Sequence, residues 1–244
     1  MRGFPPVSWR ILALFDRVPA YRTLSHPLVS LKPRELLALL AIESRRQAAL
    51  VIGEDLGTVP RGLPSQLARW GILSSRVLLF ERDRQGSFRS ASQYSRRALV
   101  TANTHDLPTL AGFWSGGDLQ IRRDLGLISE GDLAEGQRKR EFERQALVRC
   151  LAGAGSLRSR RQPESSYELC AAVNAFLCKT PAPLVGLSLD DLAGETEPIN
   201  VPGVPPERYP SWTRRMRLPV EALREDPALR STLEGAAARA RPPS

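Results

Sequence analysis

Short apolar segments alternate with longer amphipathic segments along most of this chain. Apolar and β-branched side chains gather in four runs of a few residues each, and such runs predict short buried strands. The predicted strands lie at 50–53, 76–80, 98–106 and 184–189. The third run ends in polar residues, so we expect that strand to continue directly into a polar loop.

The segments between these runs have the composition and spacing of helices. RELLALLAIESRRQA places leucines on one face of a strong helix-forming sequence. Asp226 and Pro227 are typical of an N-cap and a first helical position. We predict helices at 34–48, 63–70, 132–151, 167–178 and 226–240, with a linker at 153–163 and a proline-rich loop at 198–210.

Strands that alternate with helices predict a parallel α/β architecture. An eight-stranded β/α barrel takes about 250 residues, and four strands make half of its wall. Residues 1–33 contain five prolines and are expected to be irregular, whereas 34–244 carry the α/β pattern. The fold class predicted from the sequence is therefore α/β, as a partial (β/α)8 barrel, in which functional loops follow the carboxyl ends of the strands.

Carboxylates and a histidine follow two of the predicted strands. Glu54 and Asp55 come directly after the first strand, and His105 and Asp106 close the third. In one parallel sheet these side chains share a rim, and a pair of carboxyl groups is what glycosidic bond cleavage requires. The residues alone leave a second interpretation open, because acids after strands often cap helices or face solvent. Aromatic side chains suited to stacking on sugar rings are Trp70, Phe113 and Trp114.

The net charge adds a competing function. The formal charge is +9 and the sequence pI is about 10.3, and basic surfaces attract nucleic acids. The arginines are scattered and no aromatic residues interleave with them, so a solvated basic surface is the favoured interpretation. Nucleic-acid binding stays an alternative function, and the net charge is the one observation that supports it.

The cysteines, histidines and apolar runs of the sequence indicate the cellular compartment and argue against a metal site and a membrane span. Cys150, Cys170 and Cys178 lack a metal-binding spacing, and we expect buried free thiols on helices in a reducing compartment. Two histidines without a zinc motif predict no metal site. No apolar run reaches about 20 residues and the N-terminus lacks a signal-peptide pattern, so we expect a cytoplasmic protein without a membrane span.

Several longer segments resemble one enzyme family. In chain order they are GEDLGTVP, VLLFERD, TANTHDLPTLAGFWSGGDL, FLCKTPAPLVGLSLDDLAGETEPINVPG and YPSWTRRMRLPVEAL. Together they resemble the amylomaltases, also called 4-α-glucanotransferases or disproportionating enzymes, of glycoside hydrolase family 77. The resemblance runs from about residue 36 to residue 241. It implies that the chain carries the last four strands of a (β/α)8 barrel, without the N-terminal half of that barrel.

The resemblance also implies roles for individual residues. Glu54 matches the family's general acid/base, Asp106 matches the carboxylate that stabilises the transition state, and Asp55 is expected to orient the Glu54 loop. The implied reaction is retaining transfer of a 1,4-α-glucan segment from one maltooligosaccharide to another or to glucose, without a cofactor. The residues that we place at the substrate-binding rim are His105, Asp55, Asn200, Gly203 and Trp114.

One part of the family pattern is missing from the sequence. The family nucleophile is an aspartate in an Arg-x-Asp-His segment about 40 to 50 residues before the acid/base, and no such segment occurs in this chain. Asp16 is the only aspartate before Asp55, but it lacks the flanking arginine and histidine, so we identify no nucleophile.

We therefore expect a truncated transferase that is marginally stable, prone to aggregation, or dependent on another polypeptide for the missing half. The alternatives are an inactive glucan-binding fragment and a basic nucleic-acid-binding protein.

Overall fold

The computed structural model describes residues 33–157, 159–223, 225–227, 229–230 and 232–234. Within it the chain divides into two compact units, one formed by residues up to 75 with 97–99, the other by 76–96 with 100 onward. Our predictions for residues 1–32, for Asp16 and for the helix end at 235–240 lie outside the described residues. The predicted domain boundary at 33–34 falls at the edge of this region and stays a prediction.

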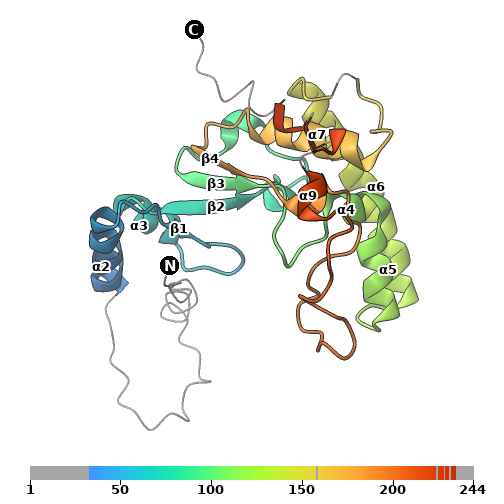
Figure 1. Ribbon diagram of the computed structural model, residues 1–244, viewed down its shortest axis with the longest axis horizontal. Helices are drawn as coiled ribbons and strands as arrows, with labels where there is room; N and C mark the ends of the chain where they lie inside the picture. The colour runs from blue at the N-terminus through green and yellow to red at the C-terminus, as the bar shows by residue number, and fades with distance from the viewer. Residues whose placement is uncertain (1–32, 158, 224, 228, 231, 235–244) are drawn as a thin grey trace. The chain divides into compact units, whose positions relative to one another are not determined.

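Four strands hydrogen-bond side by side in the order in which they occur in the chain (Figure 1). The first two are parallel, with Ile52 opposite Leu73. A sheet in which each strand neighbours the next along the chain, with helical segments between them, is typical of a β/α barrel wall. The strands are β1 (Ile52–Gly53), β2 (Leu73–Val77), β3 (Ala98–Thr101) and β4 (Leu184–Gly186).

The second strand does not lie where the sequence predicted it. We expected 76–80, whereas β2 ends at Val77 and Leu78–Phe80 form the 3-10 turn η2. Leu78 and Leu79 are buried by that turn, so the apolar run continues beyond the strand. Ser74 is a polar residue that is buried inside β2. Because it interrupts the apolar residues, the hydrophobicity pattern did not indicate where the strand begins.

Two predicted strands are shorter and more exposed than we expected. The run at 50–53 leaves Leu50 64% and Ile52 36% exposed, because β1 has β2 as its one hydrogen-bonded neighbour in the described sheet. The run at 184–189 ends as a strand at Gly186, and Leu189 instead begins a helix and is largely exposed.

The first unit has a small apolar core beneath two helices. The helices α2 (Pro33–Arg46) and α3 (Leu63–Arg69) confirm the predictions at 34–48 and 63–70. A proline in the first turn of α3 fits that position, because the amide hydrogen that proline lacks would have no helical partner there. The side chains that form the core are Leu37, Leu63, Leu67 and Ile72.

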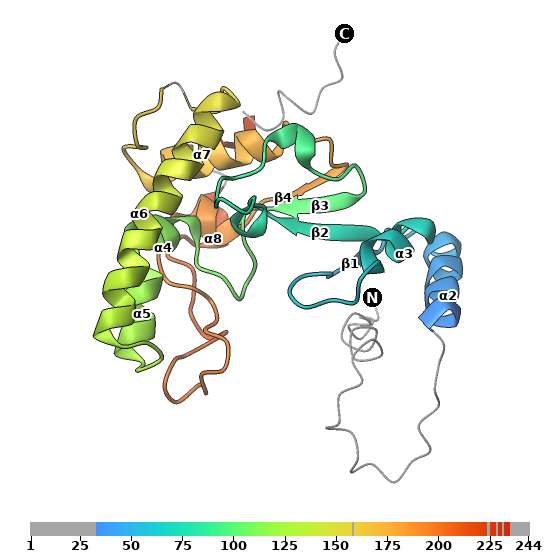
Figure 2. The same cartoon turned by 180° about the vertical axis from the view of Figure 1, so that it is seen from behind.

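The second unit is mainly helical beyond β3 (Figure 2). Here α4 packs against α5 and α7, and α6 also packs against α5 and α7. The core of this unit includes Leu147 and Leu151 of α6 with Val173 and Phe176 of α7. The helices are α4 (Leu110–Ser115), α5 (Gly117–Asp124), α6 (Glu130–Gly153), α7 (Ser166–Leu177), α8 (Leu189–Leu192) and α9 (Val220–Leu223).

Helix starts follow capping chemistry more closely than hydrophobic spacing. We predicted that α6 begins at Asp132, but Ser129 and Asp132 form a reciprocal capping box, which moves the start to Glu130. The N-cap predicted at Asp226 is confirmed, because its carboxylate accepts a hydrogen bond of 2.9 Å from the Leu229 amide. The short helices α4, α8 and α9 were not predicted.

The three cysteines are free, but only one is buried. Cys170 on α7 is buried, whereas Cys150 and Cys178 are partly exposed, so the prediction of three buried thiols is wrong. Burial raises the pKa of Cys170 to about 12 and that of Cys150 to about 11, so both stay protonated at neutral pH. Among the described helices, none is both long enough and apolar enough to cross a bilayer.

Gly112 in α4 provides a test of this packing. A Cβ atom there would lie 2.4 Å from the backbone oxygen of Thr196, so Gly112→Ala is expected to lower the free energy of unfolding by about 1–3 kcal/mol. The matched control is Gly153→Ala at the end of α6, where a Cβ meets nothing within 4 Å and helix propensity rises. Urea unfolding of both variants measures the difference, and equal stabilities would contradict the packing described.

Candidate active site

The loop that carries His105 and Asp106 follows β3 and ends at α4. A turn closes it, in which the Leu107 amide donates to the Thr104 carbonyl at 3.1 Å and the Asp106 amide lies 3.3 Å from the Thr104 hydroxyl. The Thr109 hydroxyl then caps α4 by accepting from the Gly112 amide. The sequence predicted this loop at the carboxyl end of a strand, and the structure has it there.

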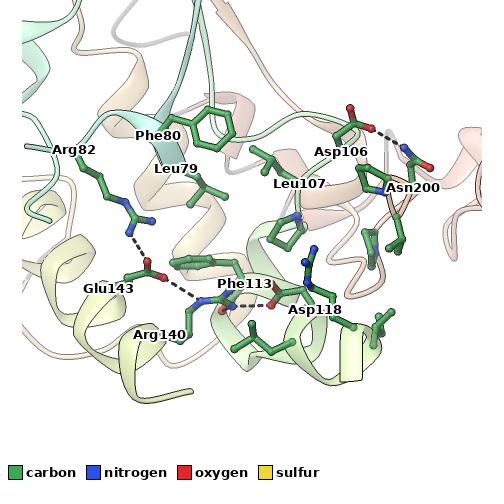
Figure 3. A pocket seen from close by; sticks show the side chains of 17 residues that line it. Leu79, Phe80, Arg82, Asp106, Leu107, Phe113, Asp118, Arg140, Glu143 and Asn200 are labelled. Carbon is green, nitrogen blue, oxygen red and sulfur yellow. Dashed lines mark hydrogen bonds and ion pairs between the residues drawn. The ribbon is translucent and has the colours of Figure 1, made fainter. Parts of the chain in front are cut away.

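Asp106 contacts a residue from a distant part of the chain. The Asn200 side-chain amide donates to Asp106 Oδ1 at 2.6 Å (Figure 3). His105 Nε2 lies 3.4 Å from the same oxygen. Asn200 lies in the irregular segment after α8. Three of the predicted rim residues are therefore adjacent, and the side chains of His105 and Asp106 remain 38% and 47% exposed.

Trp212 is a neighbour of this site that sequence reasoning missed. Its ring centroid lies 5.1 Å from that of His105, with 47° between the ring planes. The side chain is 61% exposed, and its backbone has φ of 66°, a left-handed conformation that costs free energy for a residue other than glycine. The available signal was the tryptophan of the YPSWTRR segment, which lies in one of the segments that resemble the family.

Two cavities flank the His105–Asp106 loop within the second unit. A cavity of about 310 Å³ is lined by Asp106, Asn200 and Phe80 among others, and one of about 290 Å³ is lined by His105 and Asn103 among others. These volumes are at the lower end of the range for small-molecule sites. Residues of one loop therefore line both of these cavities.

Paired charges occupy the far wall of the larger cavity (Figure 3). The Arg140 guanidinium donates to both Asp118 oxygens at 2.7 and 2.9 Å and stacks over the Phe113 ring at 4.2 Å. Glu143 bonds Arg82 at 2.5 Å and Arg140 at 3.3 Å. Because arginines already neutralise these two carboxylates, Asp106 is the acid of this cavity better placed for a ligand.

The predicted pair Glu54 and Asp55 lies in the first unit. Asp55 is buried, and its Oδ1 accepts a hydrogen bond of 2.9 Å from the Ser75 amide of β2. The Ser75 hydroxyl donates to the Gly53 carbonyl at 3.2 Å. These bonds fasten the segment after β1 to β2 and leave Glu54 exposed. The convergence of Glu54 with Asp106 spans the two units and stays a prediction.

The remaining predicted residues are farther from this loop. Trp114 on α4 lies 5.9 Å from the Arg144 guanidinium, and Gly203 sits in an exposed turn with φ of 78°. Neither is among the described residues that line the two cavities. Phe113 is buried beneath Arg140, so its ring face is not free for a sugar. Among the described residues, no group of three acidic, histidine or cysteine side chains could bind a metal ion.

Asp191 at the start of α8 is a second residue that sequence reasoning missed. It is 4% exposed and accepts hydrogen bonds from the Leu110 amide at 2.6 Å and from Asn103 Nδ2 at 3.0 Å. Burial, with a smaller contribution from neighbouring Asp190, raises the pKa of this carboxyl to about 7, against the lowering effect of the two donors. Cys170, which faces it from α7, is protonated in this pH range.

The raised pKa of Asp191 predicts how stability depends on pH. The folded state binds the proton more tightly than the unfolded state, so the stabilisation is complete below pH 3.8 and is lost as pH rises through about 7. In Asp191→Asn this loss is absent. Between pH 4 and pH 8 the free energy of unfolding of the variant should therefore rise relative to that of the parent chain, by on the order of 1–4 kcal/mol. Urea unfolding at a series of pH values measures this difference, with Glu195→Gln as the control. Parallel pH profiles of the parent chain and Asp191→Asn would contradict the prediction.

Comparison with known proteins gives the family. A profile of the 4-alpha-glucanotransferases matches residues 17–220. The 4-alpha-glucanotransferase of Haemophilus influenzae is 33% identical over 203 residues, which make up 81% of this chain and 29% of that protein. That of Mycobacterium tuberculosis is 34% identical over 181 residues, 72% of this chain and 25% of that protein. The chain therefore spans less than a third of the length of these relatives.

Solved structures agree with the sequence comparison. The amylomaltase of Corynebacterium glutamicum superposes with a TM-score of 0.78 at 29% identity, over 84% of this chain and 31% of that one. An amylomaltase of Streptococcus agalactiae, solved with acarbose, shares the fold, with a TM-score of 0.51 at 15% identity, over 84% of this chain and 35% of that one. These findings confirm the predicted partial barrel and the predicted resemblance, and the chain belongs to the 4-alpha-glucanotransferase family, glycoside hydrolase family 77.

Proposed function

We propose that this chain supplies the acid/base and sugar-binding part of a 4-α-glucanotransferase site. The reaction is the transfer of a 1,4-α-glucan segment from one maltooligosaccharide to another or to glucose. The observation that carries the proposal is the contact of Asp106 with both Asn200 and His105 at the end of β3, beside two cavities. Membership of the family supports the reaction class.

Retaining transfer proceeds in two steps with a covalent intermediate. Glu54 gives its proton to the 4-oxygen of the departing glucan while the bond from C1 to that oxygen breaks and a carboxylate bonds C1. In the second step the deprotonated Glu54 takes the proton of the acceptor hydroxyl, whose oxygen displaces the carboxylate from C1. Asp106 and His105 bind hydroxyls of the same sugar, and these bonds strengthen as charge develops on the ring.

The carboxylate that bonds C1 has no identified counterpart in this chain. Its Arg-x-Asp-His segment is absent from the sequence. We propose that a polypeptide with the other strands of the barrel supplies it and pairs with β1, where Ile52 of the strand and Leu50 just before it are exposed. The small share of the relatives' length that this chain spans supports this proposal.

A glucan-binding protein without turnover is the second candidate function, and the absence of the nucleophile segment favours it for the chain by itself. Binding to nucleic acid has less support, because Arg82, Arg140 and Arg214 already pair with carboxylates of the chain. The three free cysteines support a reducing compartment, and we propose the cytoplasm.

Sugar binding by the chain alone can be measured by titration with maltotriose. Asp106→Ala is expected to weaken binding about tenfold, because it removes a charged hydrogen-bond acceptor from the sugar site. Asp132→Ala is the control, since that carboxylate caps α6 and lines neither cavity. The same chain should release little or no glucose from maltotriose. Equal affinities of the parent and the Asp106 variant would contradict the sugar-binding role.

Catalysis can be tested in a chimera in which the Corynebacterium glutamicum amylomaltase supplies the residues that this chain lacks. Glu54→Gln is expected to lower kcat by about 10²–10⁴-fold, because the general acid is lost. The control is Glu43→Gln, an exposed acid of α2 that pairs with Arg46 and should leave kcat unchanged. Near-normal turnover of the Glu54 variant in an active chimera would refute the assignment.

A further inference from the structure

The His105–Asp106 loop is fastened at both ends by one buried carboxylate. At the start of the loop, Asn103 Nδ2 donates to Asp191 Oδ2 at 3.0 Å, and at its end the Leu110 amide donates to Oδ1 at 2.6 Å. The six residues between these two donors include both of the site side chains. The two ends of the loop are therefore held by a single side chain that comes from α8.

Asn103 also closes the loop on itself. Its Nδ2 lies 3.1 Å from the Pro108 carbonyl oxygen. This oxygen and the Asp191 carboxylate are both hydrogen-bond acceptors. This fixes the orientation of the side-chain amide, since an amide turned over would set oxygen against oxygen. Asn103 lines the smaller cavity, and its carbonyl oxygen is the group that it retains for accepting a hydrogen bond.

Asp191 is itself rigidly placed. The Ser188 hydroxyl accepts from the Asp191 amide and caps α8, which follows directly after β4. The carboxylate is almost fully buried, and Asp191 is not among the residues that line either cavity. A buried carboxylate is unfavourable unless donors compensate it, and both donors described belong to the loop and its exit. Asp191 therefore acts on a ligand only through the loop.

We propose that Asp191 is the positioning residue of the sugar site, which fixes the 103–109 loop so that His105 and Asp106 face their cavities. The part of this inference that concerns sugar binding rests on the proposed function, whereas the part that concerns loop geometry does not. The competing explanation is that Asp191 only stabilises the start of α4, in which case its removal changes stability and leaves His105 in place.

The histidine resonances of the whole chain separate these explanations. The chain has two histidines, His26 and His105, so the ring protons of His105 can be assigned with His26→Gln. In the parent chain the nearby Trp212 ring shifts them. In Asp191→Asn the Asn103 donor would face an amide rather than a carboxylate, and we expect the His105 signals to move and broaden.

Glu195→Gln is the matched control. Glu195 is a similarly enclosed acid just after α8, but it bonds Arg214 and the Arg217 amide rather than the loop. Its substitution should leave the His105 signals in place. Should Asp191→Asn fail to fold, Asn103→Ala removes the bonds to Asp191 and to the Pro108 carbonyl, keeps the Leu110 bond to Asp191, and should move the same signals. Unmoved His105 signals in a folded Asp191 or Asn103 variant would overturn the proposal.

Titration of the same samples with maltotriose separates this inference from the proposed function. We expect Asp191→Asn to bind about tenfold more weakly than the parent chain, and Glu195→Gln to bind equally. If the His105 signals are displaced in Asp191→Asn but the parent chain binds no maltotriose, the positioning role is supported and the sugar site is contradicted. Unchanged affinity together with displaced signals would refute the effect of loop position on binding.

Discussion

The burial of Asp191 is the constraint on which the arrangement of the candidate site depends. A carboxyl group in this environment requires hydrogen-bond donors, and the donors described are Asn103 and the Leu110 amide. The exit of β3 is thereby tied to the helix that follows β4. The neighbouring Asp190 pairs with Arg214 at 2.8 Å, which ties the segment of Trp212 to the same helix. One short helix thus organises both partners of the His105–Trp212 contact.

Charge pairing also decides which acids remain available for chemistry. Asp118 and Glu143 are nearer the interior, but each is bound to an arginine, and replacing Glu143 would remove the carboxylate that pairs with Arg82. Asp106 instead has an amide and a histidine as partners and is half exposed. Donors of this kind can be exchanged for sugar hydroxyls at little cost. The site therefore separates structural carboxylates from a carboxylate that can bind a ligand.

The elements that the sequence predicted well are those in which local pattern and burial agree. In α6 and α7 the apolar spacing matches the face that packs, and a serine cap marks each start. The start of β2 was missed because Ser74 is polar and buried, which only its neighbours in the fold explain. Asp191 lies in the short helix α8, which was not predicted, and its burial depends on a loop 81 to 88 residues away. Trp212 was missed because a positive φ angle leaves no mark in the sequence.

The exposed first strand limits what this part of a barrel can do by itself. Asp55 satisfies the Ser75 amide, so the segment that carries Glu54 has a local anchor. That anchor fixes one side of the strand, while the opposite edge of β1 offers backbone groups to a further strand. The proposed positioning by Asp191 needs only residues of the second unit, whereas the acid/base step that we propose is assigned to Glu54, a residue of the first unit. Under the proposed function, sugar binding therefore requires only the second unit, whereas catalysis requires Glu54 and a nucleophile that is not identified in this sequence.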